Sequence, residues 1–315
     1  MSTALALLEI VVPVFLVVGA GYASARTGFL AGAAIDALTA FGVRVGIPAL
    51  LFLALLRVDL DRAVDWRALL AFFAAIIIAF FASMALSRLV WRRRPGESVA
   101  VGFSAFFGNV VMLGIPIADR AYGGEVTAAV FGLIAFHSAH NYFFGFVAME
   151  MIRSDGSSVW TGLRRAFVTT ARNPLMWSLA GIPLNLAGVA LPGILLEGLD
   201  LLAAAGIPVA LFSLGGVLTR YRLRDEIGEA LMVSGRAMLA LPALVWLLTA
   251  GVFGLAPEFV RAAVILAAMP PGLNGYIFAS LYDRAVGTAA SAVLLGTILS
   301  IGSITFWLAL LAAWS

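Results

Sequence analysis

The sequence predicts an all-α polytopic membrane protein, on the evidence of its composition, its charge placement and an internal repeat. Of the 315 residues, 63% are hydrophobic and 12% are charged, and the mean hydropathy is +1.05. A soluble chain is about half apolar and about a quarter charged, and its core could not hide this many apolar side chains. The composition therefore argues against a soluble enzyme, a disordered chain and a nucleic-acid-binding module, and it makes the lipid bilayer the first expected partner.

Ten apolar stretches are long enough to cross a bilayer as helices, which takes roughly 20 residues each. They leave only short loops between them, so any chemistry must lie inside the membrane or at its two faces. The ten expected spans are residues 5–24, 33–56, 67–91, 97–118, 124–150, 166–190, 195–219, 228–254, 258–281 and 286–312.

The arginines indicate the orientation of these spans. Loops after odd-numbered spans hold 12 arginines and loops after even-numbered spans hold 5, while Arg44, Arg172 and Arg236 fall within spans. Loops rich in basic residues remain in the cytoplasm. We therefore expect both termini on the non-cytoplasmic side of a bacterial inner (plasma) membrane.

Two pairs of segments match between the halves of the chain. Residues 46–52 (GIPALLF) resemble residues 206–212 (GIPVALF), and residues 119–123 (DRAYG) resemble residues 283–287 (DRAVG). The offsets are 160 and 164, in the same order, which indicates a repeat of five spans. Because five is odd, the second copy must enter the membrane from the opposite side, as in many secondary transporters.

This repeat predicts two five-helix units, residues 1–150 and 166–315, joined by a short cytoplasmic linker at 151–165. Transporters with inverted repeats bind their substrates near the midplane, at discontinuous helices. Proline lacks the backbone N–H and crowds the preceding turn, so Pro116 in the fourth span and Pro270-Pro271 in the ninth are expected to break their helices. The alternative is that these prolines are packing kinks, which are common in membrane helices.

Several motifs resemble the auxin efflux carrier family over nearly the whole chain. The most specific is residues 108–116 (GNVVMLGIP), which is similar to the fourth-helix motif of that family. Asn173-Pro174, the helix at 206–208 and the stretch 271–279, followed by Tyr282, are similar to the same family. The resemblance implies ten helices in two inverted repeats, with broken fourth and ninth helices that cross, a fold shared with the bile-acid symporters.

The resemblance also implies a mechanism and a substrate class. A transport domain (about 67–150 and 228–312) would move against a scaffold (about 5–56 and 166–219) in an elevator-like cycle. Members of the family carry organic anions, such as auxin in plants and malate or malonate in some bacteria. We therefore expect a secondary transporter of small carboxylates, with a homodimer formed through the scaffold helices. The alternatives are a sodium-coupled organic anion symporter of the bile-acid type and a non-transport receptor or channel.

Two asparagines are aligned with the expected breaks. Asn109 lies two helical turns before Pro116 and Asn274 lies one turn after Pro270, so each amide shares a face with its proline. An amide donates hydrogen bonds to a carboxylate without a fixed charge, and the positive ends of the half-helices add attraction. The alternative is that each amide merely binds carbonyls released by its proline. The candidate substrate-binding residues are Asn109, Met112, Gly114, Ile115, Pro116, Pro270, Pro271, Gly272 and Asn274.

The remaining polar candidates lie inside spans. His137, with His140 and Asn141 at helical spacing beside it, is a candidate for proton coupling, because histidine titrates near neutrality; the alternatives are a polar network and a neutral buried histidine bonded to a carbonyl. Sodium is the other coupling ion considered. Arg44 precedes Pro48 by one turn and could bind an anion or a helix C-terminus. The chain has no cysteine and no catalytic or metal-binding motif, so no enzyme activity, metal site or cofactor is expected.

Overall fold

The computed structural model describes residues 3–152, 174–221 and 226–314, together with residues 160, 164, 167–168 and 171–172. Within these residues the protein is helical, and the single strand-type pairing among them is an antiparallel bridge between Gly108 and Pro271. The prediction of an all-helical membrane protein is confirmed. Asn173 and most of the predicted linker at 151–165 lie outside the described residues.

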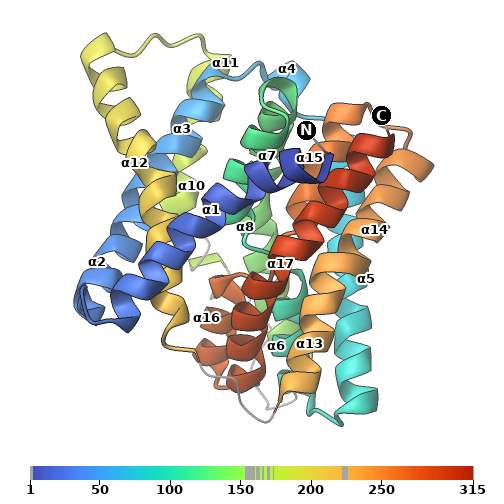
Figure 1. Ribbon diagram of the computed structural model, residues 1–315. Helices are drawn as coiled ribbons and strands as arrows, with labels where there is room; N and C mark the ends of the chain where they lie inside the picture. The colour runs from blue at the N-terminus through green and yellow to red at the C-terminus, as the bar shows by residue number, and fades with distance from the viewer. Residues whose placement is uncertain are drawn as a thin grey trace.

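The helices pack as a bundle in which both ends of the chain lie at the same end of the molecule (Figure 1). The elements are α1 (Thr3–Arg26), α2 (Gly32–Phe41), η1 (Gly42–Gly46), α3 (Ile47–Arg57), α4 (Leu60–Ala63), α5 (Trp66–Val90), α6 (Pro95–Phe106), η2 (Val110–Gly114), α7 (Ile115–Ala121), α8 (Gly124–Ile152), α10 (Pro174–Ser178), α11 (Gly181–Leu186), α12 (Gly193–Leu218), α13 (Ile227–Gly235), η3 (Arg236–Ala240), α14 (Leu241–Trp246), η4 (Leu247–Val252), α15 (Pro257–Ala267), α16 (Leu273–Tyr282) and α17 (Val286–Trp314).

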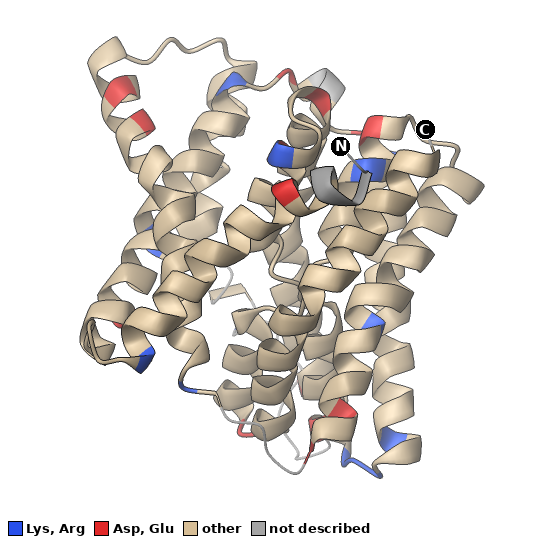
Figure 2. Ribbon diagram, viewed as in Figure 1, with Lys and Arg blue, Asp and Glu red and all other residues tan. Residues whose placement is uncertain are grey.

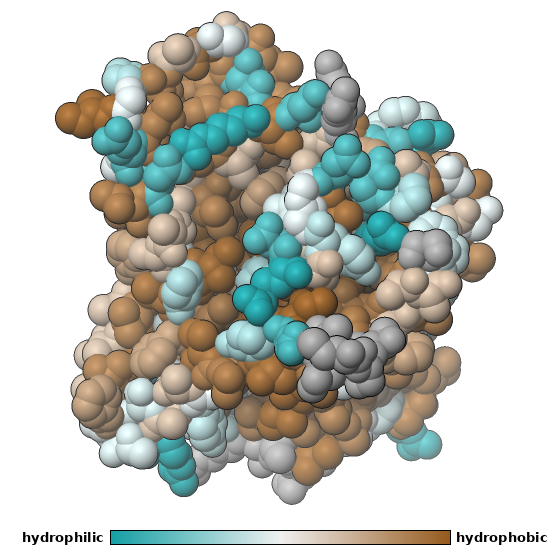
Figure 3. Space-filling view, turned by 45° about the horizontal axis from the view of Figure 1, so that its top comes forward, coloured by the Kyte–Doolittle hydropathy of each residue, from teal (hydrophilic) through white to brown (hydrophobic). Residues whose placement is uncertain are grey.

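In the described part of the chain, six helical stretches are long and apolar enough to cross a membrane. The expected spans at 97–118 and 258–281 are each divided into two shorter pieces, and α8 carries polar residues near its centre. Charged residues lie mostly near the two ends of the helices (Figure 2), and hydrophobic residues make up much of the face seen in Figure 3. The six stretches are Leu7–Arg26, Gly32–Arg57, Trp66–Val90, Gly193–Leu218, Ile227–Val252 and Val286–Trp314.

Three π-helical turns, η1, η2 and η3, each end one residue before an X-Pro pair. In each turn, the residue before the proline donates its N–H to the carbonyl five residues earlier; Ile115, for example, donates to Val110. Proline cannot donate this bond, and its ring crowds the carbonyl four residues back. The wider π turn therefore accommodates the proline without ending the helix. The three prolines are Pro48, Pro116 and Pro242.

The prediction that Pro116 breaks the fourth span is therefore wrong. Helix α6 ends at Phe106 and helical structure resumes at Val110, so the break consists of residues 107–109. Pro116 lies in the first turn of α7, which continues directly from η2, and the π turn accommodates its missing N–H and its ring. In the ninth span the prediction is confirmed, because α15 ends at Ala267, α16 begins at Leu273, and the two prolines lie between them.

The two breaks cross and bind each other through their backbones. The N–H of Asn109 donates to the carbonyl of Pro270 at 2.8 Å, and the N–H of Gly272 donates to the carbonyl of Phe107, also at 2.8 Å. Broken backbone is tolerated inside a membrane only where it is buried in protein or lines a cavity. Here each break supplies hydrogen-bond partners for the other, and these bonds hold the two segments together at the crossing.

Helix α12 packs along α1 and along the second span, made of α2, η1 and α3 (Figure 1). At one point α12 and the second span touch through their backbones: a Cβ on Gly46 would overlap the backbone of Gly206, and a Cβ on Gly206 would overlap that of Gly46. Glycine is therefore required at both positions. These are the first residues of the matched GIP segments.

A partly buried group of charged and hydroxyl side chains joins the ends of α5, α13 and α17; we call it the Arg93 cluster (Arg93, Glu226, Glu229, Thr288 and Ser87). Arg93 pairs with Glu226 and with Glu229, at 2.8 Å in each case. Ser87 and Thr288 donate further hydrogen bonds to Glu229. Burial by itself would raise the pKa of Glu226, but hydrogen bonds from Arg93 and Thr288 outweigh it, and the pKa is lowered.

Candidate functional site

A cavity of about 600 Å³ lies at the crossing of the two broken spans. Both breaks line it, together with η1 and its neighbours and the middle of α8. Pockets for small molecules fall in the range of about 300–1,000 Å³, so this cavity can hold one. It brings together six of the residues that the sequence analysis selected: Arg44, Asn109, Met112, His137, Gly272 and Asn274.

Two helices begin at this cavity. Asn109 precedes the first residue of η2, and Asn274 is the second residue of α16. The first N–H groups of a helix have no partner within it, and the helix dipole makes this end partly positive. Two helix starts that line one cavity therefore favour an anion there.

The side chain of Asn274 has a fixed orientation. The hydroxyl of Tyr142 on α8 donates to the Oδ1 atom of Asn274 at 2.9 Å. Because this bond occupies the amide oxygen, the Asn274 NH₂ group is left as the free end. The Asn109 side chain is half-buried and has no hydrogen-bond partner among the described residues. Both amides are thus available as donors.

Three polar residues on α8 form a chain of hydrogen bonds. The amide nitrogen of Asn141 lies 2.9 Å from Nε2 of His137, and its oxygen lies 2.9 Å from Nδ1 of His140. His137 is 1% exposed and lines the cavity, whereas His140 and Asn141 do not. The three side chains therefore form one polar network, and a role in proton coupling stays a prediction.

The charges around the cavity favour an anion. Asp36 and Arg44 are the charged residues among those that line it. Asp36 is paired with Arg220 at 2.6 Å, while Arg44 has no carboxylate partner in the described part of the chain. The acidic charge is therefore neutralised by Arg220, and the basic charge of Arg44 is not neutralised.

Other selected residues support the crossing without lining the cavity. Gly114 is the last residue of η2, Ile115 and Pro116 are the first two residues of α7, and Pro270-Pro271 lie in the break between α15 and α16. Gly114 is close-packed, since a Cβ there would meet Leu266. These residues shape the backbone at the crossing.

Sequence reasoning missed Tyr142, Ser138, Asp36 and Thr39, all of which line the cavity. Asp36 and Thr39 are polar, lie three residues apart in the otherwise apolar span of Arg44, and so share a face. That spacing could have identified both residues as cavity candidates from the sequence. Tyr142 had no such signal, because its role depends on contact with a helix 132 residues away.

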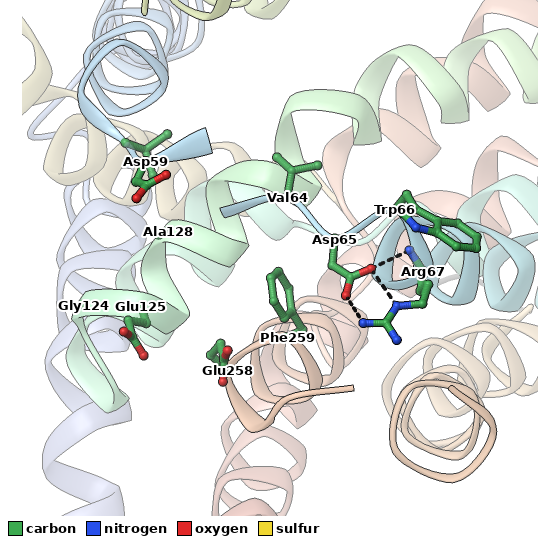
Figure 4. A pocket seen from close by; sticks show the side chains of 11 residues that line it. Asp59, Val64, Asp65, Trp66, Arg67, Gly124, Glu125, Ala128, Glu258 and Phe259 are labelled. Atoms are coloured by element: carbon green, nitrogen blue, oxygen red, sulfur yellow. Dashed lines mark hydrogen bonds and ion pairs between the residues drawn. The ribbon is translucent and has the colours of Figure 1, made fainter. Parts of the chain in front are cut away.

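A second cavity, of about 750 Å³, is lined by the α4–α5 connection and the starts of α8 and α15. Figure 4 shows four carboxylates around it, Asp59, Asp65, Glu125 and Glu258. Arg67, which also lines this cavity, pairs with Asp65 at 2.7 Å and lowers its pKa, so the net negative charge comes from the other three carboxylates. The negative charge of this larger cavity disfavours an anionic ligand, so the cavity at the crossing is the better candidate for a carboxylate.

Comparison with known protein families identifies the family of this chain. A family model described as "Membrane transport protein" matches residues 6–159 and 139–308, which together cover most of the sequence. The chain belongs to this family. Auxin efflux carriers are among its relatives: the chain is 26% identical over 128 residues to "Auxin efflux carrier component 4" of Arabidopsis thaliana, covering 40% of this chain and 20% of the carrier. The expected membership of the auxin efflux carrier family is confirmed.

Two full-length relatives of this membrane transport protein come from microorganisms. One, from Rhizobium meliloti, is named "Putative malonate transporter"; it is 26% identical over 303 residues, which cover 94% of this chain and 93% of the relative. The other, from Escherichia coli K12, is named "Uncharacterized transporter YfdV"; it is 26% identical over 291 residues, which cover 89% and 90%. The chain is therefore a membrane transporter and not an enzyme.

Proposed function

We propose that this membrane transport protein is a secondary carrier of small carboxylates, and that the carboxylate binds in the cavity at the crossing. One observation carries the proposal: hydrogen-bond donors and positive ends converge on a single cavity. They are the amides of Asn109 and Asn274, the starts of η2 and α16, and Arg44. Hydrogen bonds to an ionised ligand are stronger than neutral ones, so this group of donors favours an anion.

The substrate class follows from the donors and from the size of the cavity. Each asparagine offers one amide, and Arg44 offers a guanidinium, which suits carboxylates geometrically. A dicarboxylate would use donors from both halves of the crossing at once. The relative from Rhizobium meliloti that is named for malonate makes malonate the first compound to test.

The proposal includes ten helices in two inverted repeats, residues 1–150 and 166–315. Two contacts support it, because in each a residue meets its counterpart from the other half. Gly46 touches Gly206, at an offset of 160, and Gly108 pairs with Pro271, at an offset of 163. Counterparts meet in this way on a two-fold axis.

The proposed cycle is elevator-like. The scaffold would comprise about 5–56 and 166–219, and the transport domain about 67–150 and 228–312. The Gly46–Gly206 contact lies within the first set and the Arg93–Glu229 ion pair lies within the second, so each set is held together by a contact of its own. The cavity is lined by residues of both sets, as a site that is opened by their relative movement should be. A homodimer through the scaffold helices, in a bacterial inner membrane, completes the proposal.

The test uses purified protein and reconstituted vesicles. Malonate, succinate, malate and auxin are first compared by thermal shift, because a ligand of the folded state raises its stability. Counterflow of the best ligand in proteoliposomes should then saturate with concentration. Imposing a proton gradient or a sodium gradient alone identifies the coupling ion. Failure of every carboxylate to shift the melting temperature, or unitary currents in a planar bilayer, would overturn the carrier proposal.

A further inference from the structure

One buried polar atom at the crossing has no role in the site as described so far. Nδ1 of His137 is buried and has no hydrogen-bond partner among the described residues. Buried polar groups are nearly always paired, so an exception calls for an explanation such as an absent ligand. The ring to which this atom belongs lines the cavity at the crossing.

The orientation of the Asn141 amide sets the tautomer of His137. In the structure the amide oxygen lies 2.9 Å from Nδ1 of His140 and the amide nitrogen lies 2.9 Å from Nε2 of His137. An amide nitrogen can only donate, so in this orientation Nε2 of His137 accepts. In the neutral imidazole the proton then lies on Nδ1, which makes the unpartnered atom a donor; the reversed amide would place the proton on Nε2.

The neighbours of the ring place this donor beside the broken span. Phe107, the first residue of the break, packs edge-on against His137 with ring centroids 5.0 Å apart. Phe107 also packs against Tyr142, with centroids 5.1 Å apart, and Tyr142 holds Asn274. His137 on α8 and Asn274 on α16, which both line the cavity, are thus linked through the rings of Phe107 and Tyr142.

We infer that His137 is a substrate-binding residue whose Nδ1–H donates a hydrogen bond to the bound carboxylate. Asn141 is a positioning residue that holds the ring in this donor tautomer, and His140 in turn fixes the orientation of Asn141. The inference rests on the proposed carboxylate function and adds a third side-chain donor to Asn109 and Asn274. It also gives the histidine pair a role other than carrying a coupled proton.

The first experiment compares two amide variants at the same position, with malonate as the probe. In His137→Asn the amide nitrogen can take the place of Nδ1, whereas in His137→Gln the longer side chain reaches toward the place of Nε2. The two variants carry the same amide group and differ by one methylene. Each therefore controls for the change in polarity that the other introduces. We expect His137→Gln to weaken malonate binding by about 10- to 100-fold, the usual effect of a lost bond to a charged ligand, and His137→Asn to bind close to wild type.

The second experiment reads the tautomer directly. In protein labelled with ¹⁵N-histidine, the Nδ1 signal of His137 should be that of a protonated nitrogen and Nε2 that of an unprotonated one, and malonate should shift the Nδ1 signal. Because His140→Gln removes one of the two histidines, its spectrum shows which signals belong to His137. Asn141→Asp replaces the donor by an acceptor, so it should move the His137 proton to Nε2 and weaken malonate binding. If His137 had only a structural role, malonate would not shift its Nδ1 signal.

The outcomes separate the two proposals. Malonate binding by the wild type with equal affinities for the Asn and Gln variants would overturn the role of His137 and leave the carboxylate carrier intact. An Nε2–H tautomer in the unliganded wild type would overturn it as well. If the wild type bound no carboxylate at all, the proposed function would fail and the inference with it.

Discussion

The N–H of Asn109 donates a hydrogen bond to the carbonyl of Pro270 at 2.8 Å. The two residues lie in the breaks of two different spans and are 161 positions apart in the sequence. This bond, with its counterpart from Gly272 to Phe107, joins the broken spans directly where their helices restart. The backbone of Asn109 is therefore used for structure, while its side chain remains available to the cavity. Substitutions of that side chain can consequently test binding without disturbing the crossing.

Asn109→Ala and Asn274→Ala should each weaken carboxylate binding by about 10- to 100-fold, which corresponds to the loss of one hydrogen bond to a charged ligand. Asn109→Asp should weaken it further, because it sets a negative charge against the substrate. Affinity measured by calorimetry with malonate checks this. Asn185→Ala is the control, since Asn185 binds the carbonyls of Leu55 and Val58 outside the cavity. Unchanged affinity in both cavity variants would place the site elsewhere, with Arg44 as the next residue to test.

Tyr142→Phe should weaken binding less than Asn274→Ala. The variant keeps the amide but frees it to rotate, and a neutral hydrogen bond contributes only about 0.5–1.5 kcal/mol, or roughly 2- to 13-fold in affinity. Tyr22→Phe on the exposed face of α1 is the matched control. A Tyr142→Phe variant as weak as Asn274→Ala would show that the tyrosine contacts the substrate itself.

Gly46→Ala should lower the free energy of unfolding by about 1–3 kcal/mol, the usual effect of overpacking a tight contact. The added methyl group meets the backbone of Gly206, which cannot rotate away. Gly19→Ala in α1 adds the same methyl group where no atom lies within 4 Å, so it should leave stability unchanged or raise it slightly. Melting curves in detergent compare the two. Equal melting temperatures would mean that the contact is looser than described.

Stability should fall as the pH is lowered through and below about 4.5, the ordinary pKa of a glutamate. The pKa of Glu226 is lower in the folded protein than this value, so the unfolded chain binds more protons in that range. The stabilisation is complete above the ordinary value and is lost as the pH falls through the lowered one. Glu226→Gln should flatten this part of the profile, whereas Glu197→Gln on the exposed side of α12 should not. Parallel profiles for wild type and Glu226→Gln would contradict the assignment.

Both termini should lie outside the cytoplasm, and the 151–165 linker should lie inside it, if the arginine distribution sets the orientation. Reporter fusions at Ser315 and Ser157 should therefore report opposite compartments. Reports from the same compartment would contradict the ten-span arrangement.

The ninth-span break and the fourth-span break show what sequence can and cannot predict. At the ninth span two consecutive prolines remove two donors, and no single turn can absorb both, so the break lies where the prolines are. At the fourth span a single proline is absorbed by a π turn, and the break moves to Gly108 and its neighbours. The sequence around residues 107–109 contains a glycine and an asparagine, which favour irregular backbone, but the proline was the stronger local signal.

The lining of the cavity was predictable only in part. Asn109 and Asn274 could be selected because each is an amide beside a proline-containing segment of an apolar span. Tyr142 on the opposite wall could not be selected, because it acquires its role from contacts with distant elements. Those contacts depend on how separate helices pack, which local spacing does not specify.

The contact between Gly46 and Gly206 sets a limit on which parts of the molecule can move. A joint between two backbones has no side-chain torsions through which one helix could slide along the other. In a carrier cycle, α3 and α12 would therefore keep a fixed position relative to each other, and the distance travelled by the substrate would be measured from this pair of helices. A substitution that loosened this joint would then shorten the step that carries the substrate across the membrane, even if the binding cavity kept its shape.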